Sequence, residues 1–539
     1  MDVFTLPQNF RNALKFGNSP TLTTNLFINV NKSIAKIASL NSTIFAFAVL
    51  FALLFTSATS KATTITSTTT GGDWATSSTW TGGTAPTASD DVVIASGAAI
   101  TVSANASCAS LVFTAGASSA SLTINGSNTL TVSGDVTING TSTTSSGTVA
   151  KTTLDIGAGT LSCASLAMVI NTSNNGSTSR ATAVLISTGV LTVTGNITVN
   201  TTISGQTGIT LSDAGTVNVG GSFMLSPVGA FTPATGTVNY NGSSQSVSSA
   251  YNYYNLTLSG SGTKTLTGTT TVTRLLTTSV TLNMANLDLT VGALVGSGDL
   301  THSTGTAGNR TLTIGALISP ATYSGILSNG TANSVLLTKS GPGILILSGA
   351  NTYTGATSIS EGTLRLGSTT ALGTSSATTV SSGAVLDLNG VTLTSAIPLT
   401  LNGTGLAITP AGALTNAGAN ASYRGAITLG SASTITATSS GTLTVSGTVT
   451  GAFALTLDGA AGTGTMSGII STPTSVIKNG AGTWSLSGAN TYTGTTTINV
   501  GVLSINTLQN FSGGASSLGA PTTNANGIIA IGASGKLQY

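Results

Sequence analysis

Charged and aromatic residues are both scarce in this chain. Each group makes up only 5 % of the 539 residues, whereas a soluble globular domain usually contains about 25 % charged residues. Apolar residues still amount to 40 %, so the composition does not predict simple disorder. Five of the 15 basic and one of the 12 acidic residues precede residue 63, which leaves 10 − 11 = −1 for the rest. A nearly neutral body offers no basic face to phosphates, and we expect no nucleic acid partner.

Only one long hydrophobic run of its kind occurs. Residues 44–55 are 12 apolar residues in a row, and Lys32 and Lys36 precede them. A membrane span needs roughly 20 apolar residues, whereas a signal peptide needs a core of about 7 to 15 before a small-x-small cleavage site. We therefore predict a signal peptide or leader over residues 1–62, cleaved between Ala62 and Thr63; a buried or anchoring helix is the alternative. The mature chain would meet a membrane only through an export or anchoring element outside this sequence.

Short alternating segments fill the chain from about residue 63 onward. Leu122 and Ile124, or Leu191 and Val193, alternate with small polar residues between Asn-Gly, Ser-Gly or Thr-Gly pairs. A period of two between turn residues is the pattern of half-buried strands. A row of β-sandwiches would need more aromatic residues, whereas Val, Ile and Leu fill the narrow bore of a solenoid. We predict an all-β fold, a right-handed parallel β-helix (β-solenoid) of roughly 20 coils with about 20 to 25 residues each.

Cysteine is rarer still. Cys108 and Cys163 are the two cysteines, and both stand in the word Ser-Cys-Ala-Ser-Leu. Their offset suits equivalent positions two or three coils apart, where each thiol would fill a small slot. A disulfide is permitted in an exported protein but would need adjacent coils. The spacing therefore favours free thiols and does not by itself decide whether the two are bonded.

Two of the three tryptophans lie close to the start of the predicted body. Trp74 and Trp80 occur with acidic residues that include Asp90 and Asp91. An uncovered end of a solenoid is a sheet edge, so we interpret these four residues as an N-terminal cap; stacking of the indoles on sugar rings is the alternative. The predicted divisions are a leader (1–62), the cap and first coils (63–100), degenerate coils (101–335) and coils with specific repeats (336–539). The last residues stop inside a predicted strand, so we expect the sequence to be truncated at its C-terminus.

The most specific pattern is a duplication. Lys339 begins the word Lys-Ser-Gly-Pro-Gly-Ile-Leu-Ile-Leu-Ser-Gly-Ala-Asn-Thr-Tyr-Thr-Gly, and Lys478 begins Lys-Asn-Gly-Ala-Gly-Thr-Trp-Ser-Leu-Ser-Gly-Ala-Asn-Thr-Tyr-Thr-Gly, an offset of 139. These words resemble the autotransporter-associated β-strand repeat of bacterial surface passengers, in two copies at residues 336–367 and 475–506. The stretch 236–264 is similar to segments of large secreted proteins of Bacteroidetes. The resemblance implies an exported β-solenoid, secreted or on the outer membrane exterior, that is often an adhesin and is followed by an export element.

Residues of the types that usually carry catalysis are few in this sequence. The chain has one histidine, His302, and its acidic residues are scattered singly apart from the pair named above. Hydrolysis or lyase chemistry on a β-helix needs paired acids, or a basic residue with bound calcium, on one face. No Gly-x-Ser-x-Gly word accompanies His302, which we expect to be an exposed turn residue. The sequence predicts no enzyme, no cofactor and no metal site; a polysaccharide-active β-helix enzyme is a low-ranked alternative.

The prediction for function is a cell-surface adhesin or passenger with extracellular polysaccharide or protein ligands. Recognition would lie in loops that interrupt the coils, such as residues 171–180, or residues 244–254 with the candidate ligand contacts Tyr251, Tyr253 and Tyr254. Packing of these tyrosines over a coil boundary is the alternative.

Two other roles compete with adhesion. A structural stalk or self-assembling filament would need only length and end-to-end association of copies. Ice binding would need outward Thr-x-Thr pairs in a flat lattice, and such pairs begin at Thr129, Thr192 and Thr442. They do not recur at one fixed coil interval, which argues against a lattice.

Overall fold

A computed structural model describes residues 62–539 apart from 117, 141–150, 171–180, 201–206, 226–228, 303–307, 316–319, 332, 409–410, 439–440 and 511. The predicted leader up to residue 61 and the predicted loop 171–180 lie outside the described residues. The body from Ala62 to Tyr539 is a single compact unit built almost wholly of strands. Two short helical turns accompany them, η1 (Ser77–Thr79) and α4 (Asn524–Gly527).

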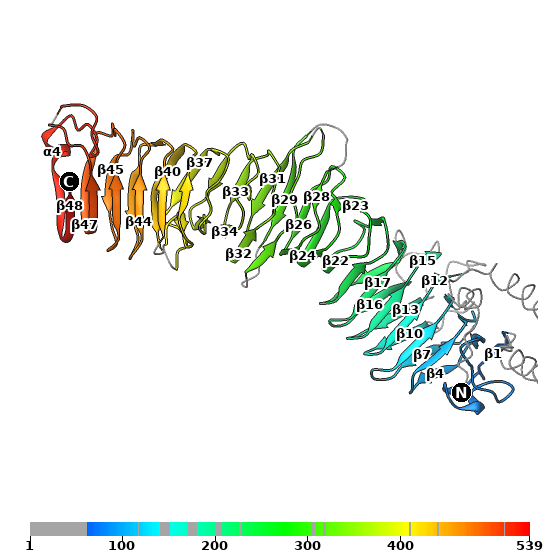
Figure 1. The fold of residues 1–539 in the computed structure, drawn as a ribbon. Coiled ribbons are helices and arrows are strands. Elements are labelled where there is room, and N and C mark those ends of the chain that lie inside the picture. The colour runs from blue at the N-terminus through cyan, green and yellow to red at the C-terminus, as the bar shows by residue number, and fades with distance from the viewer. Residues whose placement is uncertain are drawn as a thin grey trace, which may run out of the picture. The chain divides into compact units, whose positions relative to one another are not determined.

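The N-terminal half of the body has three stacks of parallel strands (Figure 1). The first stack is β1 (Thr64–Thr66), β3 (Asp91–Ile94), β6 (Ser110–Phe113), β9 (Asp135–Asn139), β12 (Ser165–Val169), β15 (Ile197–Asn200) and β18 (Phe223–Met224). The second is β2 (Gly71–Asp73), β4 (Ala99–Val102), β7 (Ser121–Ile124), β10 (Lys151–Gly157), β13 (Ala181–Ile186), β16 (Thr207–Leu211) and β19 (Ala230–Thr232). The third is β5 (Ala106–Cys108), β8 (Thr129–Val132), β11 (Thr160–Cys163), β14 (Val190–Val193), β17 (Thr216–Val219), β20 (Thr237–Tyr240), β22 (Tyr253–Leu258) and β24 (Thr270–Thr278).

Three faces continue through the C-terminal half. A short separate sheet accompanies their beginning and consists of β21 (Gln245–Val247), β23 (Lys264–Leu266), β25 (Leu282–Asn283) and β28 (Leu300–Thr301). Face 1 is β26 (Leu289–Val291), β29 (Arg310–Ile314), β31 (Val335–Lys339), β33 (Thr357–Ile359), β35 (Thr378–Val380), β37 (Leu399–Gly403), the start of β40 (Ile427–Ala437) and β42 (Val449–Thr450). Face 2 is β27 (Leu294–Gly296), β30 (Ala321–Tyr323), β32 (Ile344–Leu347), β34 (Gly362–Leu366), β36 (Ala384–Asp387), β38 (Leu414–Asn416), the end of β40, β43 (Ala454–Asp458), β45 (Ser475–Lys478) and the start of β47 (Thr495–Ile505). Face 3 is β39 (Ala421–Tyr423), β41 (Thr442–Val445), β44 (Thr463–Met466), β46 (Thr483–Leu486), the end of β47 and β48 (Ile529–Gln538).

The predicted parallel β-solenoid is confirmed, with about 17 coils, a coil being one circuit of the chain through its faces. The expected number of roughly 20 was slightly high because several coils are longer than expected. Leu161 pairs with Leu191 in the next coil, whereas the step from Leu345 to its partner Leu364 is much shorter. Coil length therefore varies while the parallel register is kept.

Alternation of small polar and branched apolar residues explains why these segments form strands. In β8 the burial pattern runs from half-buried Thr129 to buried Leu130, exposed Thr131 and buried Val132. Successive strand side chains point to opposite faces, so every second residue enters the bore. Burial of one such side chain contributes about 1.5–3 kcal/mol, and the stack repeats this gain in each coil.

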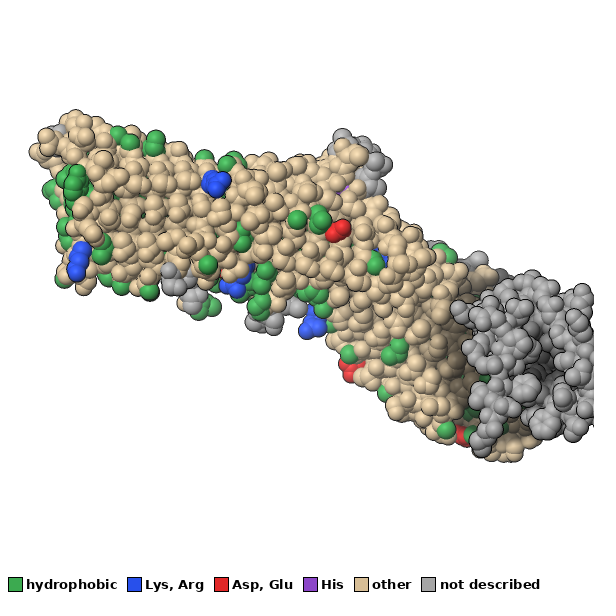
Figure 2. All heavy atoms as spheres, in the orientation of Figure 1, with side chains coloured by type: hydrophobic (Ala, Val, Ile, Leu, Met, Phe, Trp, Pro, Cys, Tyr) green, Lys and Arg blue, Asp and Glu red, His purple; other side chains and the backbone are tan. Residues whose placement is uncertain are grey.

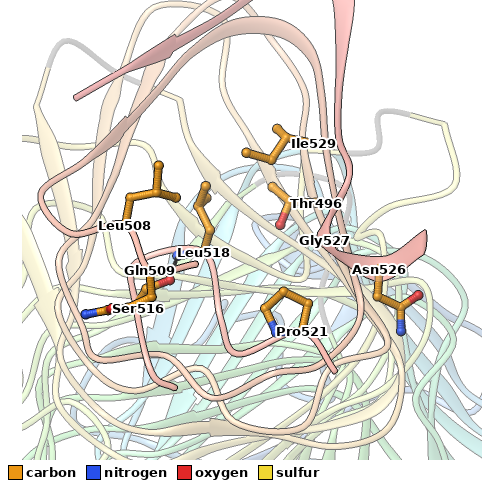
Figure 3. Close-up of a pocket in the computed structure, with 9 residues that line it drawn as sticks. All are labelled: Thr496, Leu508, Gln509, Ser516, Leu518, Pro521, Asn526, Gly527 and Ile529. Carbon is orange, nitrogen blue, oxygen red and sulfur yellow. Dashed lines mark hydrogen bonds between the residues drawn. The ribbon is translucent and has the colours of Figure 1, made fainter. Parts of the chain in front are cut away.

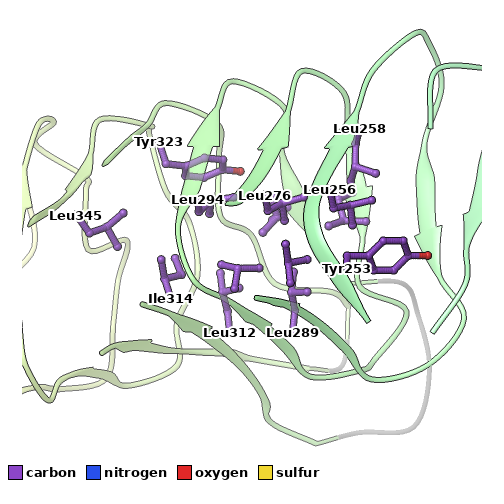
Figure 4. Close-up of a cluster of buried hydrophobic side chains, with 14 of the residues drawn as sticks. Tyr253, Leu256, Leu258, Leu276, Leu289, Leu294, Leu312, Ile314, Tyr323 and Leu345 are labelled. Atoms are coloured by element: carbon purple, nitrogen blue, oxygen red, sulfur yellow. The ribbon is translucent and has the colours of Figure 1, made fainter. Parts of the chain in front are cut away.

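The bore is filled by columns of like residues. Leu256, Leu276 and Leu294 stand at one register in consecutive coils, and all three are at most 1 % exposed. Leu289 and Leu312 form a second column across the bore (Figure 4). Each side chain packs on its equivalent in the next coil, so the core is continuous along the solenoid.

The two copies of the predicted repeat begin on different faces. Lys339 ends β31 of face 1, whereas Lys478 ends β45 of face 2. Six register steps lead along face 2 from Leu345, in the first copy, to Lys478, at the start of the second. The offset between the copies therefore spans six coils and the further step from face 1 to face 2, so the second copy is turned by one face relative to the first.

Candidate binding surface

The two tryptophans of the predicted cap are buried against each other. Trp74 and Trp80 are 4 % and 2 % exposed, and their rings meet edge to face with centroids 5.1 Å apart. Trp80 Nε1 donates to the Trp74 carbonyl oxygen at 2.8 Å, and the Trp80 backbone forms an antiparallel bridge with Ser67. Neither indole presents a free face to a sugar ring. Their geometry favours the packing role over the sugar-stacking alternative.

The two acids of the predicted cap hold neighbouring segments together. Asp90 Oδ1 accepts from the Thr63 hydroxyl at 2.5 Å, and Asp90 Oδ2 accepts from the Thr87 hydroxyl at 2.6 Å and the Thr87 amide at 2.8 Å. These hydrogen bonds lower the pKa of Asp90 to about 2. Asp91, half-buried on β3, accepts from Ser110 Oγ at 2.5 Å. Each carboxylate thus has its own structural partners.

The tyrosines that were candidate ligand contacts are mostly buried. Tyr253 is 0 % exposed and Tyr251 is 6 % exposed, while Tyr254 is of intermediate exposure. The Tyr253 hydroxyl donates to the Ser248 carbonyl oxygen at 2.7 Å, and the Tyr251 hydroxyl accepts from the Leu225 amide at 2.5 Å. A ligand cannot reach the first two without opening the coil, so Tyr254 alone of the three keeps surface for a contact.

These tyrosines fill a junction in the bore. Tyr251 packs against Phe223 with ring centroids 5.0 Å apart and against Phe231 at 5.8 Å. Phe223 lies on the last strand of the first stack and Phe231 on the last strand of the second. Beyond them the coil shortens, since the step from Val238 to its partner Leu256 is shorter than the two steps that precede it in this stack. The aromatic rings therefore occupy the space where two stacks end.

The two cysteines lie at one register, two coils apart. Cys108 pairs with Val132, and the steps Leu130 to Leu161 and Thr131 to Ser162 place Val132 beside Cys163. Both thiols are free and buried, as the sequence favoured. Burial raises the pKa of each thiol to about 12. These are inert packing residues.

His302 is not the exposed turn residue that the sequence suggested. It is 5 % exposed, because it follows the strand alternation of buried Leu300 and half-buried Thr301 and so points inward. Neither ring nitrogen has a hydrogen-bond partner. The expectation was wrong because the flanking polar residues suggested a turn, whereas the strand period places His302 in the bore.

Buried lysines explain the first word of the repeat. Lys339 is 0 % exposed, and its Nζ donates to the carbonyl oxygens of Ser340 at 3.1 Å, Gly341 at 2.7 Å and Glu361 at 2.9 Å. Gly341 has φ 75°, a left-handed conformation that glycine adopts without strain and that forms the turn around the ammonium group. Burial lowers the pKa of Lys339 to about 8. The lysine ties the turn after its own strand to the same turn one coil later.

The second copy repeats this arrangement on its own face. Lys478, also 0 % exposed, donates to the carbonyl oxygens of Asn479 at 2.6 Å, Gly480 at 2.7 Å and Val500 at 3.1 Å. A third buried lysine, Lys264, has a similar role outside the repeats. Sequence reasoning missed all three lysines. For Lys339 and Lys478 a readable signal exists, a lysine at the end of an alternating apolar strand followed by x-Gly-x-Gly.

The Asn-Thr-Tyr word is an internal clamp. Asn351 Oδ1 accepts from the Leu327 amide at 2.9 Å and Asn351 Nδ2 donates to the Ala371 carbonyl at 2.6 Å, so one side chain joins three coils. The Tyr353 hydroxyl bonds the Thr357 hydroxyl at 2.8 Å inside the bore. Asn490 and Tyr492 make the equivalent bonds in the second copy. The identical residues of the repeat therefore serve the interior.

A continuous outward column of hydroxyl groups begins on β24, whose start pairs with β26, and runs along the whole of face 1. The column takes one residue from each of nine consecutive strands, each half-buried or exposed in the burial pattern, and it contains eight threonines and one serine. Its members, which we call the hydroxyl column, are Thr271, Thr290, Thr313, Thr338, Ser358, Thr379, Thr400, Thr428 and Thr450. Neighbouring strands are about 4.8 Å apart. The column is therefore a row of uncharged donors and acceptors at a constant step.

A similar column runs along the third stack of the N-terminal half. Its members are Ser107, Thr131, Ser162, Thr192, Asn218, Asn239, Thr257 and Thr277. The amide of Asn218 donates to the Thr192 hydroxyl at 3.1 Å, and that of Asn239 donates to Asn218 at 3.0 Å. Unequal coil lengths thus hide an equal register of single outward residues. The Thr-x-Thr pairs do not align, because Thr129 shares its register with Thr160 and Val190.

Charge is sparse on the surface of the body. Figure 2 shows isolated basic and acidic side chains on a face dominated by other residue types. Among the described residues the ion pair found is Arg365 Nε with Asp387 Oδ2 at 2.8 Å, with the Asp387 side chain 2 % exposed. The part of the chain that the structure covers contains no group of three or more His, Cys, Asp or Glu side chains able to hold a metal ion. No helix among the described residues is long and apolar enough to span a membrane.

A shallow pocket lies near the last strands. Thr496, Leu508, Leu518 and Ile529 contribute to its lining, together with Asn526 (Figure 3). About 60 Å³ is open inside it, whereas pockets for small molecules are typically about 300–1,000 Å³. The pocket is suited to water molecules rather than to a substrate.

Comparison with known proteins supports the passenger resemblance. The family model described as "Passenger-associated-transport-repeat" matches residues 337–366 and 476–505, within one residue of the predicted copies at both ends. The chain is also 30 % identical over 206 residues to a protein named "Adhesin BmaC autotransporter" from Brucella suis biovar 1 (strain 1330). That match covers 38 % of this chain and 5 % of the relative. No solved structure matches the chain.

The predicted repeats are thus confirmed as those of autotransporter passengers. The repeats and the adhesin match together support secretion to the cell surface, as the sequence indicated.

Proposed function

We propose that the chain is a non-enzymatic surface adhesin of passenger type, and that its hydroxyl column is the extended surface that binds neutral extracellular polysaccharide. The single observation that carries the ligand class is the register of nine hydroxyl residues over nine strands without a charged member. A charged polymer would find no counter-charge there. Similarity to a protein named as an adhesin supports the broader role.

The column suits a long ligand with regularly spaced hydroxyl groups. Threonine is β-branched and restricted at χ1, so its hydroxyl loses little freedom on binding. A single neutral hydrogen bond contributes only about 0.5–1.5 kcal/mol. Binding would therefore depend on many coils acting together, which fits an extended polymer better than a small molecule.

The test is binding of the full chain to immobilised neutral polysaccharides. The variant Thr338→Val, Thr379→Val, Thr400→Val removes three hydroxyls and keeps the branched shape. We expect about tenfold weaker binding or more, because three hydrogen bonds are lost. The matched control, Thr444→Val, Thr463→Val, Thr465→Val, removes three outward hydroxyls from face 3 and should leave binding unchanged. Equal binding by both variants contradicts the role of the column, and fibre formation without any binding would favour the scaffold alternative.

Ice binding is a second candidate, because the hydroxyl column is a row of outward hydroxyl groups at a constant step, although the Thr-x-Thr pairs do not align into a lattice. An assay of ice recrystallisation with the same variants distinguishes the two. The glycan proposal would be replaced by an ice-binding one if the wild type inhibits ice recrystallisation, the face 1 variant does not, and neither binds polysaccharide.

A further inference from the structure

The corner around His302 concentrates unsatisfied polar atoms. Among the described residues, eight buried side-chain nitrogen or oxygen atoms have no hydrogen-bond partner, and four of them belong to His302, Arg310 and Asn333. The four are both His302 ring nitrogens, Arg310 Nε and Asn333 Oδ1. Buried polar groups are normally paired. The concentration at one corner therefore needs a reason other than packing.

The neighbouring turn is strained. Ala285 and Asn286 have φ of 49° and 60°, in the left-handed region that asparagine tolerates but that is unfavourable for the Cβ of alanine. The turn is closed by the Leu287 amide, which donates to the Met284 carbonyl at 2.8 Å. Its Asn286 side chain accepts from Asn333 Nδ2. Strain of this kind persists only when surrounding contacts hold it.

Contacts between coils hold this turn in place. The Met284 amide donates to the Thr301 carbonyl at 2.7 Å, directly before His302. Asp288 Oδ1 accepts from the Thr311 amide at 2.8 Å. The turn is thus attached to the end of β28, which His302 directly follows, and to β29, which begins at Arg310.

The charged groups that act on His302 come from the two elements beside it. Arg310 of β29 disfavours a second positive charge, and Asp288 of the turn favours it. Burial is the largest influence and, with Arg310, lowers the pKa of His302 below the ordinary value of 6.5. The imidazole is therefore neutral in the folded chain at pH 7.5.

We propose that this corner is an acid-sensitive joint: proton uptake by His302 releases the turn 284–288 from β28 and β29 and opens the solenoid locally. A protonated imidazole would be a second cation near Arg310, and neither ring nitrogen has a hydrogen-bond partner in the closed corner, so the proton binds more readily once the corner opens. Thr290 and Thr313 of the hydroxyl column lie on the coils that this corner joins. Opening would interrupt the column, which gives acid control over the face 1 surface whatever its ligand.

The direction with pH follows from linkage. The folded state binds the His302 proton less readily than the open state, so the closed corner is fully stable above about pH 6.5 and loses stability as pH falls below it. One linked proton changes the opening constant by at most about tenfold per pH unit. His302 is the only histidine in the 539 residues, so no other imidazole contributes.

The test is hydrogen exchange measured by mass spectrometry on the full chain at pH 7.5 and 5.5, corrected for the intrinsic rates. Peptides from residues 282–302 should report an opening constant up to about tenfold larger at pH 5.5 than at pH 7.5. Peptides from residues 442–466 should report no change. The variant His302→Leu should abolish the response. A response that persists in His302→Leu, or no local opening in the wild type, overturns the proposal.

A second measurement on the wild type avoids dependence on the variant. The chain with ¹³C-labelled histidine gives one imidazole signal, whose titration by NMR reports His302 directly. Titration below pH 6.5 with local opening supports the joint. Titration at or above 6.5 overturns it, whether or not His302→Leu folds. Both readouts are independent of ligand binding, so failure of the adhesin proposal leaves this one to stand or fall separately.

Discussion

Replacing the buried lysine of the second repeat by methionine should weaken the coils around it. Lys478→Met keeps the length and apolar stem of the side chain but leaves three carbonyl oxygens without their donor, those of Asn479, Gly480 and Val500. Hydrogen bonds to charged groups contribute about 1.5–3 kcal/mol each. Some of this is recovered, because the substitution also removes the cost of burying an ammonium group. We expect a net local loss of about 2–4 kcal/mol after that offset.

The loss should be confined to neighbouring coils, because each coil of a solenoid contacts mainly the coils beside it. Hydrogen exchange at pH 7 over residues 475–505 should show opening roughly 30- to 1,000-fold more frequent than in the wild type. Lys339→Met should behave alike at the first copy. Lys151→Met, at an exposed position, is the control and should change nothing.

The pH dependence offers an independent check. Burial lowers the pKa of Lys478 from 10.5 to about 8, so between these values the folded state binds fewer protons than the unfolded state. The contribution of Lys478 to the free energy of unfolding should therefore increase with pH across that window. In urea unfolding, the gain in stability between pH 7.5 and pH 9.5 should be smaller for Lys478→Met than for the wild type. Unchanged exchange in both methionine variants would refute the structural role given to these lysines.

Three further outcomes follow from other parts of the chain. The hydrogen bonds that lower the pKa of Asp90 from 3.8 to about 2 supply stability that is present above pH 3.8 and lost as pH falls through 2; hydrogen exchange in β1 should show this loss, and Asp90→Asn should remove it. Gly494→Ala would place a Cβ 1.9 Å from the Thr474 carbonyl oxygen, whereas Gly308→Ala meets nothing within 4 Å; urea unfolding should show about 1–3 kcal/mol lost in the first variant and little in the second. Leu312→Ala should cost about 2–5 kcal/mol in the same assay, because it leaves a cavity in a bore column.

The architecture could be predicted from the sequence because the period of two is local. Leu130 and Val132 reveal their burial by alternation alone, and the repeated word around Lys339 is long enough to be specific. Coil number was less accessible, since coil length changes at the aromatic junction around Tyr251. Such a change depends on which strands pair across coils, and no short segment of sequence contains that information.

The candidate surface was harder to predict for the same reason. Thr379 and Thr400 are closer in the sequence than Thr400 and Thr428, yet all three share one register. A search for a fixed interval misses such a column. Counting outward positions from the buried residues of each strand would have found it, and the same count would have placed His302 in the bore.

The turning of the second repeat by one face has a consequence for how such a chain can grow. Lys478 and Asn490 make the same bonds as Lys339 and Asn351 although they stand at a different azimuth around the axis. The repeat therefore makes its hydrogen bonds to adjacent coils wherever it begins around the axis, and it does not require a particular face of the solenoid. A duplicated segment need not be a whole number of coils to be accommodated, so insertion can lengthen the protein and, in the same event, rotate whatever the inserted segment displays.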